Sequence, residues 1–94
     1  MSDATNVPLS RDGLTALVRE QLAVILERPV EEIGEDVSFG ELGADSLALI
    51  ELVEALEERL ATQVEGFHID DADLEGLSSV RAAVDYLVAR LRVG

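Results

Sequence analysis

Ser46 is the residue of this chain whose setting most suggests chemistry, in the stretch LGADSLALIEL (residues 42–52). A serine hydrolyses a substrate when a histidine and an acid activate it, often within a G-x-S-x-G turn. Ser46 has no such turn around it, and the single histidine, His68, is expected on an exposed loop. The sequence therefore predicts no catalytic residue and no self-contained hydrolysis.

Ser46 also stands at the expected first turn of a helix, directly after Asp45. Either residue is a good N-cap, and capping is the simplest interpretation of both. A helix N-terminus also favours a phosphate, because its dipole and free N–H groups face the anion. A serine here could therefore carry a phosphodiester that another protein installs.

The acidic residues include one partial match to a calcium-binding loop. DADLEGLSSVRA (residues 71–82) has acids at its first, third and fifth positions and Gly76 at the sixth, as an EF-hand loop does. The twelfth position is Ala82 where an EF-hand needs a bidentate glutamate, and the loop would overrun the last helix. The chain also lacks cysteine, so we predict no metal site.

The charge of the chain restricts its partners. The net charge is −13, all seven basic residues are arginines, and residues 31–75 hold fifteen of the twenty acids with Arg59 as their one base. Such a field repels nucleic acid and anionic membrane surfaces but attracts a basic protein patch. Neither a signal peptide nor an apolar run that could span a bilayer is visible. We expect a cytoplasmic monomer that binds proteins.

The apolar pattern predicts helices over about residues 10–27, 45–60 and 78–91, with a short helical turn near 70–75. Ser10 and either Ser78 or Ser79 are expected caps. This pattern favours an all-α, small four-helix bundle of three main helices and a short third helix. Residues 10–91 form the expected domain, with tails at 1–9 and 92–94. The expected core residues are Leu14, Leu17, Val18, Leu22 and Ile25; Ile33, Val37, Phe39 and Leu42 of a long loop over 29–44; Leu49, Leu52, Val53, Leu56 and Leu60; and Val80, Val84, Leu87 and Leu91.

The second helix is expected to have two different faces. A projection at about 100° per residue places Leu47 and Ile50 opposite the core stripe, among glutamates. A merely solvated face would include basic residues for i,i+4 support, and this one does not. Apolar residues with a charged rim are typical of a docking patch. The predicted partner-binding residues are Asp45, Leu47, Ile50, Glu51, Glu54, Glu57 and Glu58.

The stretch LGADSLALIEL resembles the prosthetic-group site of acyl carrier proteins, whose pattern is L-G-x-D-S-L with Glu and Leu about a turn later. VEALEERL (residues 53–60) and VRAAVDYL (residues 80–87) are also similar to the family, as is the long loop that contains Phe39. The resemblance covers roughly residues 10–91.

This resemblance implies that Ser46 is the attachment point of 4′-phosphopantetheine, which a phosphopantetheinyl transferase moves from coenzyme A. The thiol of the arm then carries an acyl group as a thioester, and the protein itself is a non-catalytic carrier. The acidic face would bind basic patches on acyltransferase, ketosynthase or adenylating enzymes.

Two departures from the family pattern affect the pathway that we expect. Glu54 stands where many members have an apolar residue on the partner face, and the segment between Leu60 and Val80 is longer than in compact fatty-acid carriers. These departures favour polyketide or other specialised biosynthesis, and the short expected tails without a linker favour a free-standing carrier. The alternatives are a peptidyl or aminoacyl carrier of nonribosomal peptide synthesis, a housekeeping fatty-acid carrier, and an acidic helical adaptor that is never modified.

Overall fold

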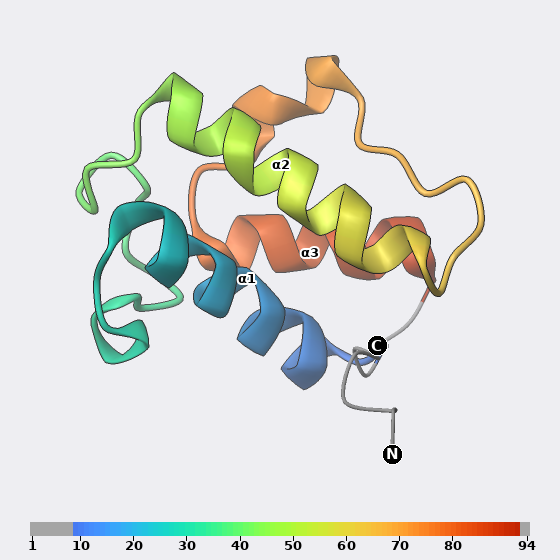
Figure 1. Cartoon of the computed structure of the whole chain (residues 1–94), viewed down its shortest axis with the longest axis horizontal. Helices are drawn as coiled ribbons and strands as arrows, with labels where there is room; N and C mark the ends of the chain where they lie inside the picture. Colours follow the sequence, from blue (N-terminus) through green and yellow to red (C-terminus); the bar gives the residue numbers. More distant parts are fainter. Residues whose placement is uncertain (1–8, 93–94) are drawn as a thin grey trace.

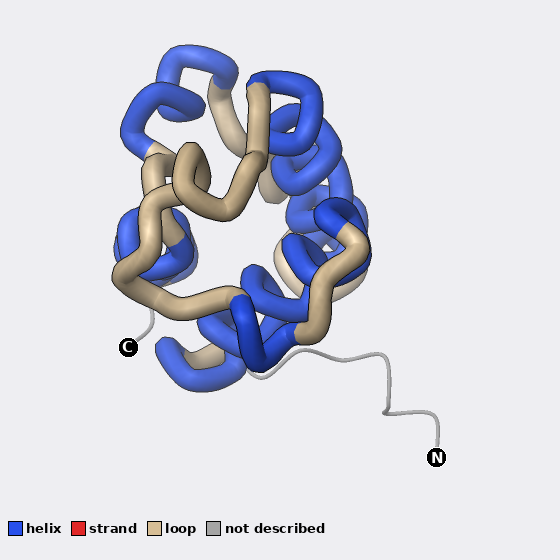
Figure 2. Tube along the Cα trace, turned by 90° about the vertical axis from the view of Figure 1, so that its left-hand side faces the viewer, coloured by secondary structure: helices blue, strands red, loops and turns tan. Residues whose placement is uncertain are grey.

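The computed structural model describes residues 9–92, and its regular elements are helices (Figure 1). The three α-helices are α1 (Arg11–Leu26), α2 (Ser46–Ala61) and α3 (Val80–Leu91), and two short 3-10 helices are η2 (Val30–Glu32) and η3 (Asp71–Gly76). Figure 2 shows helices joined by loops, and β pairing within residues 9–92 is confined to an isolated bridge between Ser38 and Ser79. The expected all-α bundle with a short third helix is confirmed. Of the predicted tails at 1–9 and 92–94, residues 1–8 and 93–94 lie outside the described residues.

Helices α1 and α3 begin where serine side chains satisfy free N–H groups. The Ser10 hydroxyl accepts the N–H of Gly13 at 3.1 Å, and the Ser79 hydroxyl accepts the N–H of Ala82 at 3.1 Å. Ser79, not Ser78, is therefore the cap of α3. The first helix ends at Leu26, because the following Glu27 has a left-handed φ of 57° that breaks the helical repeat.

The hydrophobic core lies between α1 and its two partners, because α1 packs against both α2 and α3. Most residues expected in the core are buried, and no buried polar side chain is found among residues 9–92. Four expected core residues are only partly buried and pack at its edge: Ile25, Val37, Leu49 and Leu91. Five buried residues were not expected there: Ala23, Ala48, Ile69, Leu77 and Ala83.

The connection from residue 27 to residue 45 is fastened to the bundle at several points. Ile33, Phe39 and Leu42 are buried, as expected for a long loop that packs on a core. Arg19 of α1 donates from Nε to the carbonyl of Ile33 at 2.8 Å and from its terminal nitrogen to the carbonyl of Val30 at 3.0 Å. These contacts therefore fix the position at which α2 begins.

The connection from residue 62 to residue 79 contains η3 and runs along the edge of the molecule (Figure 1). Ile69 and Leu77 are its buried residues, while Phe67 and Leu74 are half-buried. No helix among residues 9–92 is long and apolar enough to cross a membrane.

Candidate functional site

Ser46 is the first residue of α2, and its side chain is exposed to solvent. The carboxylate of the preceding Asp45 caps the helix by accepting the N–H of Ala48 at 2.9 Å. Capping was the simplest interpretation of both residues, and the structure assigns it to Asp45. The Ser46 hydroxyl is therefore not required to start the helix and is accessible to another molecule.

The backbone before Ser46 is held by a chain of hydrogen bonds. The N–H of Ala44 donates to the carbonyl of Phe39 at 2.9 Å, and Gly43 donates to Gly40 at 3.1 Å. Gly43 has a φ of 87°, a left-handed conformation that residues with a Cβ rarely adopt. This turn orients the chain as it enters α2.

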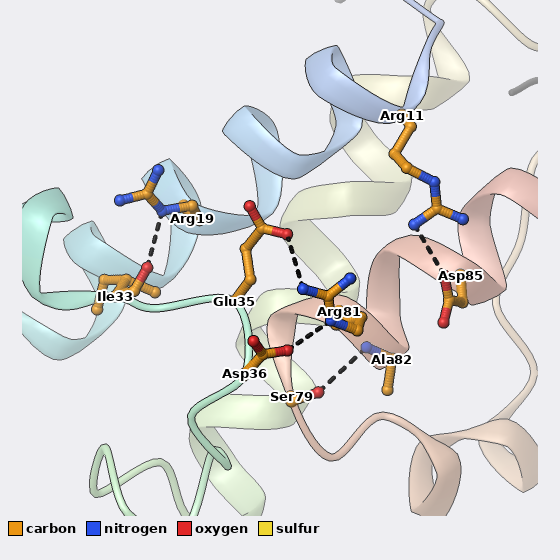
Figure 3. A network of polar contacts seen from close by, with 9 residues as sticks. All are labelled: Arg11, Arg19, Ile33, Glu35, Asp36, Ser79, Arg81, Ala82 and Asp85. Atoms are coloured by element: carbon orange, nitrogen blue, oxygen red, sulfur yellow. Dashed lines mark hydrogen bonds and ion pairs between the residues drawn. The ribbon is translucent and has the colours of Figure 1, made fainter.

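The same loop is tied to the start of α3, as Figure 3 shows. The N–H of Phe39 donates to the carbonyl of Ser78 at 2.8 Å, and the N–H of Arg81 donates to the carbonyl of Glu35 at 3.0 Å. The Arg81 guanidinium also donates to the Asp36 carboxylate. This hydrogen bond, assisted by the charge of Arg81, lowers the pKa of Asp36 below its usual value.

A mostly apolar hollow of about 190 Å³ begins beside Ser46. Leu49 and Ile50 of α2 form one wall, and Leu74 and Glu75 of η3 form the other. The sequence analysis did not include Leu74 and Glu75 in the site, since they lie far from Ser46 along the chain. In the sequence, the one indication that this turn packs against the rest of the protein was Leu74, a large apolar residue among the acids of residues 70–75.

A second hollow of about 140 Å³ adjoins the first, because Ile50 and Leu74 line both. Its other lining residues have a more polar character: Val53, Glu54, Glu57, His68 and Ile69. The two hollows form a groove between α2 and the 62–79 connection, which starts at Ser46 and ends near His68. This groove is the surface next to the candidate attachment site.

The outer face of α2 has the composition that the sequence indicates. Leu47 is 62% exposed and Ile50 is 44% exposed, which makes them two of the large apolar residues of 9–92 that reach the surface. Glu51, Glu54 and Glu58 are exposed around them. The face thus combines an apolar centre with carboxylates.

Glu57 differs from these glutamates. Its side chain is only 25% exposed, and its Oε2 accepts the N–H of Ile69 at 2.7 Å. The same oxygen lies 3.0 Å from Nδ1 of His68. Glu57 therefore contacts the 62–79 connection, whereas the other acids face solvent.

His68 lies on an exposed loop, as expected, with a side chain that is 65% exposed. It contacts Glu57 and lies 3.6 Å from Asp70, at the end of the groove away from Ser46. The structure does not bring it to the serine, so no catalytic pair forms. Among residues 9–92, no cluster of His, Cys, Asp and Glu could hold a metal ion.

Comparison with known proteins places the chain in a family. The family model described as a phosphopantetheine attachment site matches residues 16–87. A solved structure of a free-standing peptidyl carrier protein, from an uncharacterized secondary metabolic pathway of Acinetobacter baumannii, has a similar fold. The TM-score is 0.75 at 22% identity, and the match covers 88% of this chain and 98% of the other. The chain belongs to the phosphopantetheine-binding carrier proteins, a family whose domain is the site of covalent 4′-phosphopantetheine attachment.

Proposed function

We propose that this chain is a carrier protein whose Ser46 hydroxyl receives 4′-phosphopantetheine from coenzyme A. The main support comes from the start of α2. Asp45 caps the helix there, so the adjacent Ser46 is not needed as the cap and is exposed. Ser46 Oγ would form a bond to the phosphorus that carries the pantetheine arm as the P–O bond of the coenzyme A diphosphate breaks. Adenosine 3′,5′-bisphosphate would leave, and the hydroxyl proton would pass to a base of the transferase. The transferase supplies this catalysis, so Ser46 needs no base of its own.

The residues around Ser46 fit such a group. The N-terminus of α2 stabilises a negative charge, and the groove beside Ser46 offers apolar contacts from Leu49, Ile50 and Leu74. When bound, the arm supplies a thiol that carries cargo as a thioester. The chain has no cysteine, so no protein thiol competes with it for cargo.

We further propose that the outer face of α2 binds the transferase and the enzymes that load and unload the carrier. Leu47 and Ile50 provide apolar contacts, and Asp45, Glu51, Glu54 and Glu58 provide the charge that attracts a basic patch. Glu57 was also predicted for this face from the sequence. Its contacts with His68 and Ile69 support a structural role in holding the 62–79 connection.

For the cargo, we propose an acyl group in polyketide or other specialised biosynthesis. An aminoacyl cargo is the second candidate, because a solved structure of similar fold is a peptidyl carrier protein. Incubation of the modified protein with an adenylating enzyme, amino acids and ATP distinguishes the two. A mass gain of one amino acid would favour the aminoacyl class, and a gain only with acyl donors would favour the acyl class.

The attachment site is tested by intact mass before and after incubation with coenzyme A, Mg²⁺ and a broad-specificity phosphopantetheinyl transferase. We expect one phosphopantetheine increment in the wild type and in Ser78→Ala, whose serine is also exposed and caps no helix. Ser46→Ala should gain nothing. No increment in folded, previously unmodified wild type would support the adaptor alternative instead.

The docking face is tested with the triple variant Glu51→Gln, Glu54→Gln, Glu58→Gln. We expect slower modification by the transferase and a weaker dependence of the rate on salt, because attraction to a basic patch is lost. The matched control neutralises Glu20, Glu27 and Glu65, which are exposed elsewhere. Equal rates in both variants would contradict a specific acidic docking face.

A further inference from the structure

The wall of the groove opposite α2 is a chain segment, residues 67–75, which is fastened to α2 through one residue. Glu57 Oε2 accepts the backbone N–H of Ile69 at 2.7 Å and contacts His68 at 3.0 Å. The side chain of Ile69 is buried in the core next to this contact. The hydrogen bond to Glu57 is a strong one, because its acceptor is a charged carboxylate. The segment is therefore held here by one polar contact, through the N–H of Ile69, and one apolar contact, through its side chain.

The other side of the segment is fastened to α3. The Tyr86 hydroxyl donates to Oδ2 of Asp73 at 2.8 Å. The Arg90 guanidinium lies 5.9 Å from the ring centre of Phe67 and 5.5 Å from that of Tyr86, within the range of a cation–π contact. The segment is thus held between two helices by side chains.

This segment ends in the residues that face Ser46. Leu74 lines both hollows of the groove, and Glu75 lines the one next to Ser46. A shift of residues 67–75 away from α2 would therefore move the wall beside the attachment site. Among the glutamates on α2, Glu57 is the one whose contacts hold residues 67–75 close to the helix.

We propose that Glu57 is a positioning residue that clamps residues 67–75 to α2 and so sets the width of the groove at Ser46. The clamp itself does not depend on modification of Ser46. Its effect on the attached arm rests on the proposed function. Glu57 acts through the N–H of Ile69 and the placement of Leu74 rather than by contact with the arm or with a partner. The contact with His68 adds less than the one with Ile69, because the side chain of His68 is 65% exposed and solvent weakens its interaction with Glu57.

The clamp is tested on the unmodified protein by hydrogen exchange of the Ile69 amide. In Glu57→Ala we expect exchange about tenfold faster or more, because the amide loses a charged acceptor. Glu57→Gln should restore most of the protection, since its carbonyl oxygen can accept the same N–H. Glu58→Ala removes the same charge from the neighbouring exposed residue and should leave Ile69 unchanged.

The amide of Leu56, in the buried part of α2, serves as the reference for global unfolding. Unchanged exchange at Ile69 in Glu57→Ala, or an equal rise at Leu56, would overturn the clamp. Neither result depends on modification of Ser46.

The link to the site is tested on the modified protein by the methyl signals of Leu74. Modification should shift these signals in the wild type and in Glu20→Ala, whose glutamate is exposed outside the docking face, and shift them by less than half as much in Glu57→Ala. No shift in fully modified wild type would overturn the role of residues 67–75 as a wall of the site. Failure of Ser46 to gain mass would instead contradict the proposed function, so the two failures are distinguishable.

Discussion

The two long connections of this bundle are fastened in different ways. Residues 27–45 are tied down by bonds between backbone groups, by the two carbonyls that Arg19 holds, and by a fully buried Phe39. Residues 62–79 are held by the buried Ile69 and Leu77 and by the side chains of Glu57, Tyr86 and Arg90 from the neighbouring helices. The first connection leads directly into Ser46, and the second forms the facing wall of the groove. A rigid support for the attachment residue is therefore combined with a wall that single side chains hold.

The two phenylalanines of the chain provide the largest expected contrast. Phe39→Ala removes a side chain that is 2% exposed and should lower the free energy of unfolding by about 3–5 kcal/mol. Phe67 is half-buried beneath Arg90, so Phe67→Ala should cost about half as much or less. Urea denaturation of both variants measures the difference. Equal losses would show that the two connections are equally integrated into the core.

Arg19 tests the polar fastening of the first connection. Arg19→Met keeps an aliphatic stem but removes the guanidinium donor from the carbonyls of Ile33 and Val30, of which Val30 still accepts the N–H of Ile33. We expect a loss of about 1–3 kcal/mol in the free energy of unfolding. Tyr86→Phe, which removes the donor to Asp73 in the second connection, should cost about 1 kcal/mol. A larger loss in Tyr86→Phe would reverse the comparison.

Asp45 and Ser46, at the start of α2, are expected to differ in their effect on stability. Asp45→Ala removes the cap on Ala48 and should cost about 0.5–2 kcal/mol. Ser46→Ala should change the melting temperature little, because Ser46 is not the cap. A marked loss in Ser46→Ala would show that the serine is needed for stability and would weaken its interpretation as a free attachment point.

The smallest expected effect concerns the surface pair of Asp36 and Arg81. Hydrogen bonding to Arg81 lowers the pKa of Asp36 below 3.8, so the folded state prefers the charged carboxylate. The resulting stabilisation is present above the usual pKa of Asp and is lost as the pH falls through the lowered value. The difference in melting temperature between wild type and Asp36→Asn should therefore be small near neutral pH and vanish in acid. A difference that persists below the lowered pKa would rule out the ion pair as its cause.

Much of the site was predictable from local sequence, because its determinants are local. The start of α2, the restriction of its cap to Asp45 or Ser46, and the exposed Leu47 follow from neighbours along one helix. The same projection grouped Glu57 with Glu54 and Glu58, and it could not show that Glu57 turns toward Ile69. That contact depends on where residues far along the chain pass α2.

The sequence by itself determined the helical class, the core-facing positions of the three main helices and the acidic character of the surface, because each depends on composition or on the helical period. It also indicated the candidate serine, through the resemblance of the motif around Ser46 to acyl carrier proteins. Tertiary structure alone decided which of two adjacent residues caps α2, that Leu74 and Glu75 face Ser46, and that Glu57 clamps a loop. The last two features arise from the packing of η3 and its flanking loop against α2 and α3, and no local pattern encodes the distance between elements that meet only in the folded chain. The cap depends on which of the two side chains reaches the N–H of Ala48.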